Sequence, residues 1–460
     1  MDILSNLVEN FISKLVSAVC DHPGEDFGQR MQEIEAASHE MIRRMIEQTL
    51  NTLDEAIAQQ AKNKHEWLVL RKASRTLETV FGSVAFQRRY YRNAQSGETC
   101  HLLDLHLGIV PGQRVSNDVR QKAVTEAVDR PYAASGKAAC PNGISKASVG
   151  NFLSDMRIVS ELRADGVKRS VPNLYVEADE DHVALQKGKL VQVKLVYVHE
   201  GREEINGRTI LKNPRYLTWP LDGDTDTLWE HIASFIENQY DTDMLQHLFL
   251  SGDAASWIRT GEEWLPGCIP ILDGYHTSKA LMALTAHVPK TRERGYKLLY
   301  GGDRDAFRQF ILTTIQAAPS EIDRCRKRKQ ANYLLSNWQR IQNRLMPDAQ
   351  GCSAEGHVSH ILSARLSSRP LGWGENNLVT MAQLRVMKAN GETISYPSAS
   401  KRIQTMDPPL VPSKKTLSSV RKTLKSTCST STVSLPVLMT GRKDSLYQAL
   451  HGLSTVSYAS

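Results

Sequence analysis

Residues 174–186, LYVEADEDHVALQ, predict the central strand of this chain. The stretch opens with an apolar run and then alternates, and in a strand successive side chains point to opposite faces. Glu177, Asp179 and Asp181 are therefore expected on one face. Three carboxylates on one face repel each other, so they require solvent, cations or raised pKa values to coexist.

Further strands are predicted after this one. Two alternating strands, a helix and two short apolar strands follow, in residues 191–200, 208–219, 227–240, 247–253 and 268–273. This order predicts a mixed sheet of the α/β class. Asp253 and Asp273 end the last two strands, and the carboxyl ends of buried strands are where α/β sheets bind ligands.

The chain before the sheet is predicted to be mainly helical. Residues 2–20 and 25–62 carry apolar positions at helical spacing, and residues 76–91 alternate around Gly82 as in a β-hairpin. Residues 116–156 predict two short helices, a glycine-containing turn and a third helix. This region is either a helix-turn-helix or an ordinary helical bundle.

The sequence divides into six regions. Residues 1–75 form a helical N-terminal region suited to dimerisation, and residues 76–170 form a hairpin with a DNA-binding helix-turn-helix-like region. The α/β core is divided into a first part, residues 171–276, and a last part, residues 347–396, by a helical insertion at residues 277–346. Residues 397–460 are a flexible basic tail rich in Ser and Thr.

The composition excludes several classes of protein. A length of 460 residues is too great for one hydrophobic core, and 41% hydrophobic with 23% charged residues is typical of globular domains. No apolar run of about 18 residues is present, so no membrane span is expected. The seven cysteines are scattered without a CxxC pair, which favours reduced thiols in the cytoplasm over a zinc site or disulfides.

The net charge of +7 is unevenly distributed. Residues 62–92 hold 8 basic and 2 acidic side chains, residues 288–344 hold 13 and 5, and residues 401–460 hold 9 and 2. Such blocks indicate either a polyanionic partner or solvated surface. The last block accounts for the whole excess, so DNA affinity of the folded part requires local basic segments.

One further acid and two histidines complete the candidate site. In GCSAEGHVSHILSARL (351–366), Ser353 is expected to cap a helix whose first turn holds Glu355, which either complements the helix dipole or is functional. His276 and His357 fit no zinc signature and are expected to support the site through hydrogen bonds. Carboxylates favour Mg²⁺ or Mn²⁺, and two such ions about 3.5–4 Å apart catalyse phosphoryl transfer.

Four segments in order resemble bacterial insertion-sequence transposases of the ISLre type, a DDE-type family distantly similar to the Mutator-like group. They are LYVEADEDHVALQ, SGDAASWI, ILDGYHTSKA and GCSAEGHVSHILSARLSSRPLGW. The segment TLETVFGSVAFQRRYY is similar too, and the resemblance covers about residues 1–396. It implies an RNase H-like catalytic core with a helical insertion between the fifth strand and the helix that carries a glutamate.

The resemblance also implies specific site residues. The family's catalytic, metal-binding acids fall on Asp179, Asp253 and Glu355, and Asp181 is the alternative for the first. The supporting residues are Asp181, Asp273, His276 and His357.

The function expected from this resemblance is transposition. The protein would bind double-stranded DNA at the element's ends as a homodimer or higher oligomer, and cut and join strands with two Mg²⁺ or Mn²⁺ ions per active site. The expected DNA contacts are Arg88, Arg89, Arg92, Lys146, Arg326, Lys327, Arg328 and Lys329. The alternatives are an RNase H-like nuclease or resolvase without joining activity, and a domesticated DNA-binding regulator.

Overall fold

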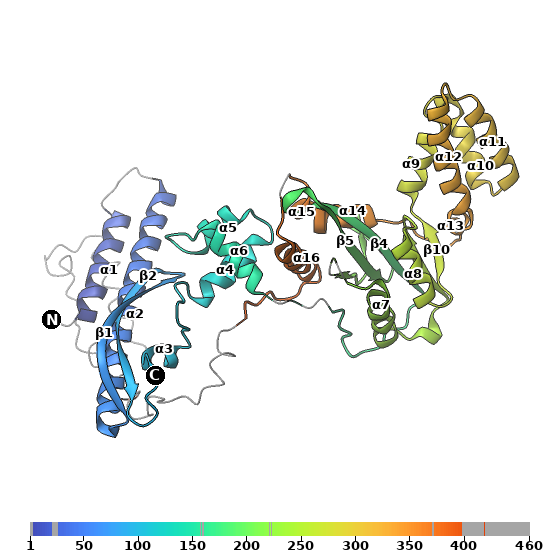
Figure 1. The fold of residues 1–460 in the computed structure, drawn as a ribbon. Helices are drawn as coiled ribbons and strands as arrows, with labels where there is room; N and C mark the ends of the chain where they lie inside the picture. Colours follow the sequence, from blue (N-terminus) through green and yellow to red (C-terminus); the bar gives the residue numbers. More distant parts are fainter. Residues whose placement is uncertain are drawn as a thin grey trace. The chain divides into compact units, whose positions relative to one another are not determined.

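The chain forms two compact units in the computed structural model, drawn in Figure 1. The described residues are 3–20, 26–156, 158, 161–219, 221, 223–369, 372–397 and 418. Of these described residues, those within 3–126, 132–149, 396–397 and 418 belong to unit 1, and those within 127–131 and 150–395 belong to unit 2. The predicted tail, residues 397–460, therefore lies almost entirely outside the described residues.

Unit 1 begins with the two predicted helices, α1 (Ile3–Cys20) and α2 (Phe27–Lys64). Helix α2 begins where the carboxylate of Asp26 accepts a hydrogen bond of 2.9 Å from the backbone N–H of Gly28. It ends at His65, which adopts a left-handed φ of 56°.

The predicted hairpin is confirmed, but it is longer than expected. Strands β1 (Trp67–Thr79) and β2 (Gly82–Asn93) pair antiparallel, and Gly82 takes a φ of 102° after the turn. Strand β1 begins before residue 76 and runs across the predicted division at residue 75. The sequence does not predict its first half, because Leu68, Val69 and Leu70 are consecutive apolar residues that are all exposed. The alternation of apolar and polar residues that identifies a strand is therefore absent there.

Helix α2 protects the second edge of β2. Three side chains at helical spacing on α2 accept hydrogen bonds of 2.9–3.0 Å from alternate backbone N–H groups of β2. Glu47 accepts from Ala85, Asn51 from Gln87 and Asp54 from Arg89. An open strand edge invites pairing with other chains, and these bonds satisfy it internally. This part of the acidic helix face is therefore packing surface.

Short helices complete unit 1 and lead into unit 2. Strand β3 (Thr99–Cys100) and α3 (Leu102–Leu107) precede the three predicted helices, which are confirmed as α4 (Asn117–Ala127), α5 (Tyr132–Ala139) and α6 (Lys146–Asp155). The hydroxyl of Ser145 accepts the N–H of Ser148 at the start of α6. The unit boundary passes through α6, after Val149.

Unit 2 contains the predicted mixed sheet. Its strands are β4 (Asn173–Ala184), β5 (Leu190–His199), β8 (Arg215–Thr218), β9 (His247–Gly252) and β10 (Ile269–Leu272). The order across the sheet is β10-β9-β4-β5-β8. Strands β4, β5 and β8 form an antiparallel meander, whereas β9 runs parallel to β4 and β10 parallel to β9.

The segment 208–219 was expected to be one strand and is two. Strand β7 (Arg208–Leu211) pairs with β6 (Arg202–Ile205) in a separate hairpin, and only β8 joins the sheet. Asn213 has a φ of 47°, and Pro214 has no N–H to donate to a neighbouring strand. These two residues therefore separate strand β7 from strand β8.

The two faces of the sheet have different coverings. Helices α7 (Thr225–Gln239) and α8 (Ser256–Trp264) pack on one face, where the even-numbered residues Leu174, Val176 and Ala178 of β4 are buried. Figure 1 shows α7 and α8 on one side of the sheet and α14 on the other. The odd-numbered residues of β4 therefore face α14.

A helical insertion follows β10, as predicted for residues 277–346. Its helices are α9 (Gly274–Leu284), α10 (Arg292–Tyr300), α11 (Arg304–Gln316), α12 (Glu321–Ser336) and α13 (Trp338–Asn343), and they share a core that includes Leu281 and Phe307. The segment then returns to the sheet as α14 (Ala354–Val358), a π-helical turn η4 (Ser359–Ser363), α15 (Ala364–Leu366) and α16 (Glu375–Ala389). Short 3₁₀ turns are η1 (Gln186–Gly188), η2 (Thr242–Met244) and η3 (Pro289–Thr291).

Two further expectations concern membranes and cysteines. Within the described part of the chain, every helix is too short or too polar to cross a bilayer. The six cysteines that the structure describes are free thiols, and Cys428 lies outside the described residues.

Candidate active site

Two of the candidate acids come from adjacent parallel strands, Asp179 from β4 and Asp253 from the first position after β9. Asp179 is in the middle of β4 and is 8% exposed. Glu177 pairs in register with Ser251 of β9, and continuing that parallel register by two residues places Asp253 beside Asp179. Gly252 permits this close approach, because a Cβ at that position would lie 2.7 Å from the carbonyl oxygen of Ala178.

The loop after β9 holds Asp253 in a defined conformation. Its Oδ1 accepts a hydrogen bond of 2.8 Å from the N–H of Ala255, and Ala254 between them adopts a φ of 64°. The hydroxyl of Tyr333, on α12 of the insertion, donates to the carbonyl oxygen of Asp253 at 2.8 Å. The insertion thus supports the backbone of a candidate acid, and the left-handed Ala254 is a strained position of the kind found at functional sites.

Glu355 comes from the far side of the insertion. It occupies the first turn of α14, and its side chain is exposed. Ser353 is the N-cap residue of this helix, but its hydroxyl makes no capping hydrogen bond, which corrects the expectation from sequence. The hydroxyl donates instead to Oε2 of Glu177, at 3.1 Å.

Two of the candidate acids act electrostatically on the third, Asp179. The pKa of Asp179 is raised to about 7, mainly because the carboxyl is buried, and further by the charges of Glu355 and Asp253. The N–H of Glu180 and the charge of His276 partly offset this. Among the described residues, no Lys or Arg forms an ion pair with these three acids. The repulsion at Asp179 is therefore expressed as a raised pKa and is not offset by a basic side chain among the described residues.

Asp273 and His276 lie close to this cluster. Asp273 caps α9, where its Oδ1 accepts the N–H of Tyr275 at 3.1 Å, and its Oδ2 lies 3.2 Å from Nδ1 of His276. The hydrogen bond from Asp273 is the main cause of a raised pKa of His276, to which the charges of Asp179 and Asp253 add. His276 thus contacts Asp273 and is under the electrostatic influence of Asp179 and Asp253.

His357 and Asp181 have hydrogen-bond partners outside the three candidate acids. Nδ1 of His357 is 3.0 Å from the hydroxyl of Tyr216, and burial lowers the pKa of this histidine. Asp181 accepts a hydrogen bond of 2.8 Å from the hydroxyl of Ser367. Of the two alternatives for the first acid, Asp179 is the one whose pKa is raised by the charges of Asp253 and Glu355.

Sequence reasoning missed a buried polar cluster around Glu177. This glutamate is 2% exposed and accepts hydrogen bonds from Tyr197, His199 and Ser353. Burial by itself would raise the pKa of Glu177, but these hydrogen bonds and the charge of His199 outweigh it and hold the pKa at about 2. The only sequence signal was that Glu177 shares a face with Asp179; its donors come from distant segments that no local pattern connects.

The candidate DNA contacts divide into paired and exposed side chains. Arg88 pairs with Asp104, Arg89 pairs with Asp54 and Glu55, and Lys327 is buried, which removes these three from the set available to phosphates. Arg328 is exposed and pairs with Glu321. The remaining exposed residues are Arg92, Lys146, Arg326 and Lys329.

The donor set for a metal consists of carboxylates alone, which suits Mg²⁺ or Mn²⁺ better than zinc. In the residues that the structure describes, no three His, Cys, Asp or Glu side chains already stand as a ready-made ligand group. The three carboxylates fit a hard divalent ion by their chemistry and charge, and Glu355 is the exposed member of the set.

The fold and site define a mixed α/β protein with a cluster of carboxylates at the sheet. The chain belongs to UPF0236, described as an uncharacterised protein family, whose model matches residues 26–402. Three similar proteins are UPF0236 proteins of Caldanaerobacter subterraneus subsp. tengcongensis. One is 33% identical over 447 residues, covering 96% of both chains. Another is 32% identical over 455 residues, covering 98% of this chain and 92% of the relative.

The third relative is 34% identical over 393 residues, covering 85% of this chain and 84% of its own, and its name joins eleven loci of that bacterium. The match over 98% of this chain extends past residue 402 into the basic tail. Most of the tail is therefore shared with relatives rather than peculiar to this chain.

Proposed function

We propose that this protein is a DDE-type transposase of an insertion sequence. It binds the ends of a DNA element and catalyses Mg²⁺- or Mn²⁺-dependent strand cleavage and strand transfer. The observation that carries the proposal is that the buried Asp179 of β4 has its pKa raised further by the charges of Glu355 and Asp253, which come from two other segments of the chain. None of the three acids forms an ion pair with a Lys or Arg among the described residues.

The topology of unit 2 supports an RNase H-like core. An antiparallel meander of three strands adjoins two parallel strands, with the first strand of the meander at the centre of the sheet. The insertion of α9–α13 lies between the last strand and the helix that carries Glu355. This is the arrangement that the family resemblance implies for the core and its insertion.

The three acids would hold the metal ions. When bound, two divalent ions would supply activation of the attacking oxygen and stabilisation of the leaving oxygen at a phosphodiester. The chain's own part is to hold Asp179 on β4, Asp253 directly after the adjacent β9, and Glu355 on α14. Asp273 orients His276 beside them.

DNA binding would fall to exposed basic side chains rather than to bulk charge. Arg92, Lys146, Arg326 and Lys329 are exposed, and Lys146 begins α6 of the helix-turn-helix-like region. Phosphate contacts of this kind give affinity without sequence information. We expect a dimer or higher oligomer, because transposition joins two ends, and a cytoplasmic location at the DNA.

The relatives add an independent argument. One relative's name joins eleven loci of a single bacterium, which indicates the same protein encoded many times. Repeated copies of one coding sequence are typical of mobile elements.

The test uses the full chain and a supercoiled plasmid that carries its coding sequence with the natural flanking DNA. We expect nicks or breaks at the element's ends with Mg²⁺ or Mn²⁺, and none with EDTA. Precleaved ends should then be joined to a second plasmid.

Each alternative has its own outcome in this experiment. Cleavage without joining would identify a nuclease or resolvase. Binding to the ends with no metal-dependent cut would identify a DNA-binding regulator, and neither outcome is compatible with a transposase.

A further inference from the structure

Strand β4 carries three acids on one face, but only Asp179 faces the other candidate acids. Glu177, two residues earlier, is 2% exposed and is turned toward the segment that leads into α14. A buried carboxylate is stable only if donors surround it. The donors to Glu177 therefore identify the segments of the chain that this carboxylate connects.

Two of the donors belong to the neighbouring strand β5. Tyr197 lies directly opposite Glu177 in the antiparallel register, and its hydroxyl donates to Oε2 at 2.5 Å. His199, two residues further along the same face, has its Nε2 3.1 Å from Oε1. An ionised carboxylate only accepts, so this ring nitrogen donates. These bonds fix the carboxylate on the sheet.

The other donors belong to the residue before α14. The backbone N–H of Ser353 donates to Oε2 of Glu177 at 2.6 Å, and the Ser353 hydroxyl donates to the same oxygen at 3.1 Å. Arg202 adds a second connection, because it bonds the carbonyl oxygen of Gly351 and lies 3.6 Å from Glu177. The start of α14 is thus tied to the sheet by its backbone.

The far end of α14 is anchored on the same side. His357 follows Ser353 by four residues, so the two share one helix face, and His357 meets the hydroxyl of Tyr216 on β8 at 3.0 Å. Glu355 lies midway between them, about 200° around the helix from each at 3.6 residues per turn. The buried residues Ala354 and Val358 lie between these positions around the helix. Glu355 therefore stands on the other flank of the buried face of α14, where it is exposed.

We infer that Glu177 is a positioning residue, which ties the N-terminal end of α14 to strands β4 and β5 and thereby sets the place of Glu355 relative to Asp179. The inference deepens the proposed function and rests on it for its catalytic consequence. The tie itself is a property of the fold and is testable without any DNA cleavage.

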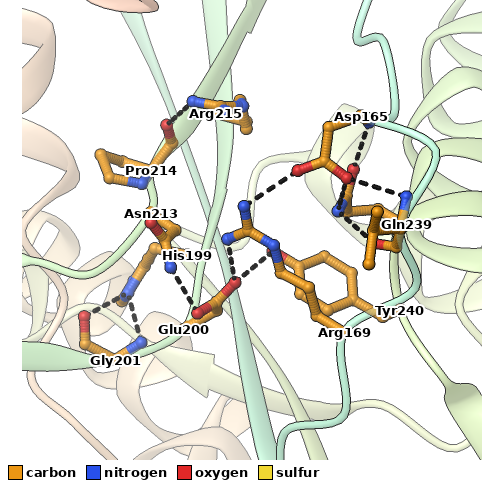
Figure 2. A network of polar contacts seen from close by, with 11 residues as sticks. Asp165, Arg169, His199, Glu200, Gly201, Asn213, Pro214, Arg215, Gln239 and Tyr240 are labelled. Carbon is orange, nitrogen blue, oxygen red and sulfur yellow. Dashed lines mark hydrogen bonds and ion pairs between the residues drawn. The ribbon is translucent and has the colours of Figure 1, made fainter.

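A matched control lies in the same sheet. Glu200, just after β5, is also a largely buried carboxylate with several donors: Arg169 at 2.9 Å, Asn213 at 2.6 Å and Tyr240 at 3.3 Å. Figure 2 shows Arg169 reaching from Asp165 to Glu200, with His199 and Gly201 beside them. This network joins β5 to the segment before β4 and to the end of α7, and none of the residues labelled in Figure 2 belongs to α14.

The experiment compares Glu177→Ala, Glu177→Gln and Glu200→Ala in the full-length protein. Amide hydrogen exchange is followed by mass spectrometry, and single-turnover cleavage is measured against Mn²⁺ concentration. In Glu177→Ala we expect exchange in peptides covering residues 351–358 to accelerate by roughly tenfold or more. Cleavage should fall by about 10–100-fold, as for other groups that orient metal ligands, with DNA affinity unchanged.

The conservative variant separates positioning from general damage. Glu177→Gln keeps one oxygen for Ser353, so its cleavage rate and its exchange in residues 351–358 should lie between those of the wild type and Glu177→Ala. Glu200→Ala should accelerate exchange around residues 165–169 and leave residues 351–358 and the cleavage rate as in the wild type.

The outcomes test the positioning role of Glu177 and the proposed function separately. Unchanged exchange at residues 351–358 in both Glu177 variants, or an equal change in Glu200→Ala, would overturn the positioning role. If the wild type cuts no DNA, the proposed function fails, whereas accelerated exchange confined to the Glu177 variants would still support the tie between β4 and α14.

Discussion

Carboxylates gather in two regions of this molecule, one in each unit, and they face different partners. On helix α2, Glu47 and Asp54 accept backbone N–H groups of β2, and Asp54 also pairs with Arg89. At the sheet of unit 2, Asp179 is influenced mainly by burial and then by Glu355 and Asp253. The first group is neutralised within the fold, and the second is not.

The difference lies in the donors, not in the number of acids. Residues 1–61 contain 11 acidic side chains, yet those that contact β2 serve packing. The candidate acids of unit 2 are only three, Asp179, Asp253 and Glu355, and the charges of the last two raise the pKa of Asp179. Function is therefore better sought where charges lack partners than where they are numerous.

The largest expected effect of this difference is on catalysis. Asp179→Asn should lower metal-dependent cleavage by more than about a hundredfold, because groups that only support a metal ligand already contribute roughly 10–100-fold. Its thermal unfolding midpoint should not fall, since the change removes a charge that burial disfavours. Cleavage assays and circular dichroism measure the two quantities. Glu47→Gln is the control. Equal losses of cleavage in both variants would show that the acids of α2 and those at the sheet of unit 2 do not differ in function.

The reverse pattern is expected in unit 1. Asp54→Ala removes an acceptor that is 1% exposed and leaves the N–H and the guanidinium of Arg89 without it. The loss should be about 2 kcal/mol, which thermal unfolding and amide exchange of β2 would register. Asp54→Asn retains an oxygen for the N–H and should be milder. If Asp54→Ala left the stability and the amide exchange unchanged, these hydrogen bonds would not be what holds β2 on α2.

Metal binding should also distinguish the two regions. At a Mg²⁺ concentration about tenfold above its dissociation constant, the wild type should gain about 1.4 kcal/mol of stability. Asp253→Asn should lose this gain, whereas Glu47→Gln should keep it. Thermal unfolding with Mg²⁺ and with EDTA measures the shift; an equal shift in Asp253→Asn would place the metal elsewhere.

The smallest effect concerns the basic side chains, which divide in the same way. Arg326 and Lys329 are exposed on α12, and Lys327 between them is buried near the carbonyl oxygen of Ala283. Alanine at either exposed position should reduce the salt dependence of DNA binding by about 0.9 in the logarithmic slope, for each phosphate that the protein no longer neutralises. Lys327→Ala should leave that slope unchanged and lower the unfolding midpoint. A reduced slope in Lys327→Ala alone would reverse the assignment.

Local patterns in the sequence anticipated most elements of the fold. The alternation in residues 174–186 predicted β4, and the helical spacing in residues 25–62 predicted α2. The pattern failed where both faces of a strand are exposed, as at the start of β1, and where Pro214 divides β7 from β8. In each case the hydrophobic period that identifies a strand is absent or interrupted.

The sequence by itself determined that Glu177, Asp179 and Asp181 share a face, because the side chains of any strand alternate. Only the tertiary structure decided what each of them does. Glu177 meets Ser353 and Asp181 meets Ser367, while Asp179 is left facing Asp253 and Glu355. The partners are separated from β4 by up to 186 residues, and contacts at that distance arise from packing of the insertion and α14 on the sheet, which no local period records.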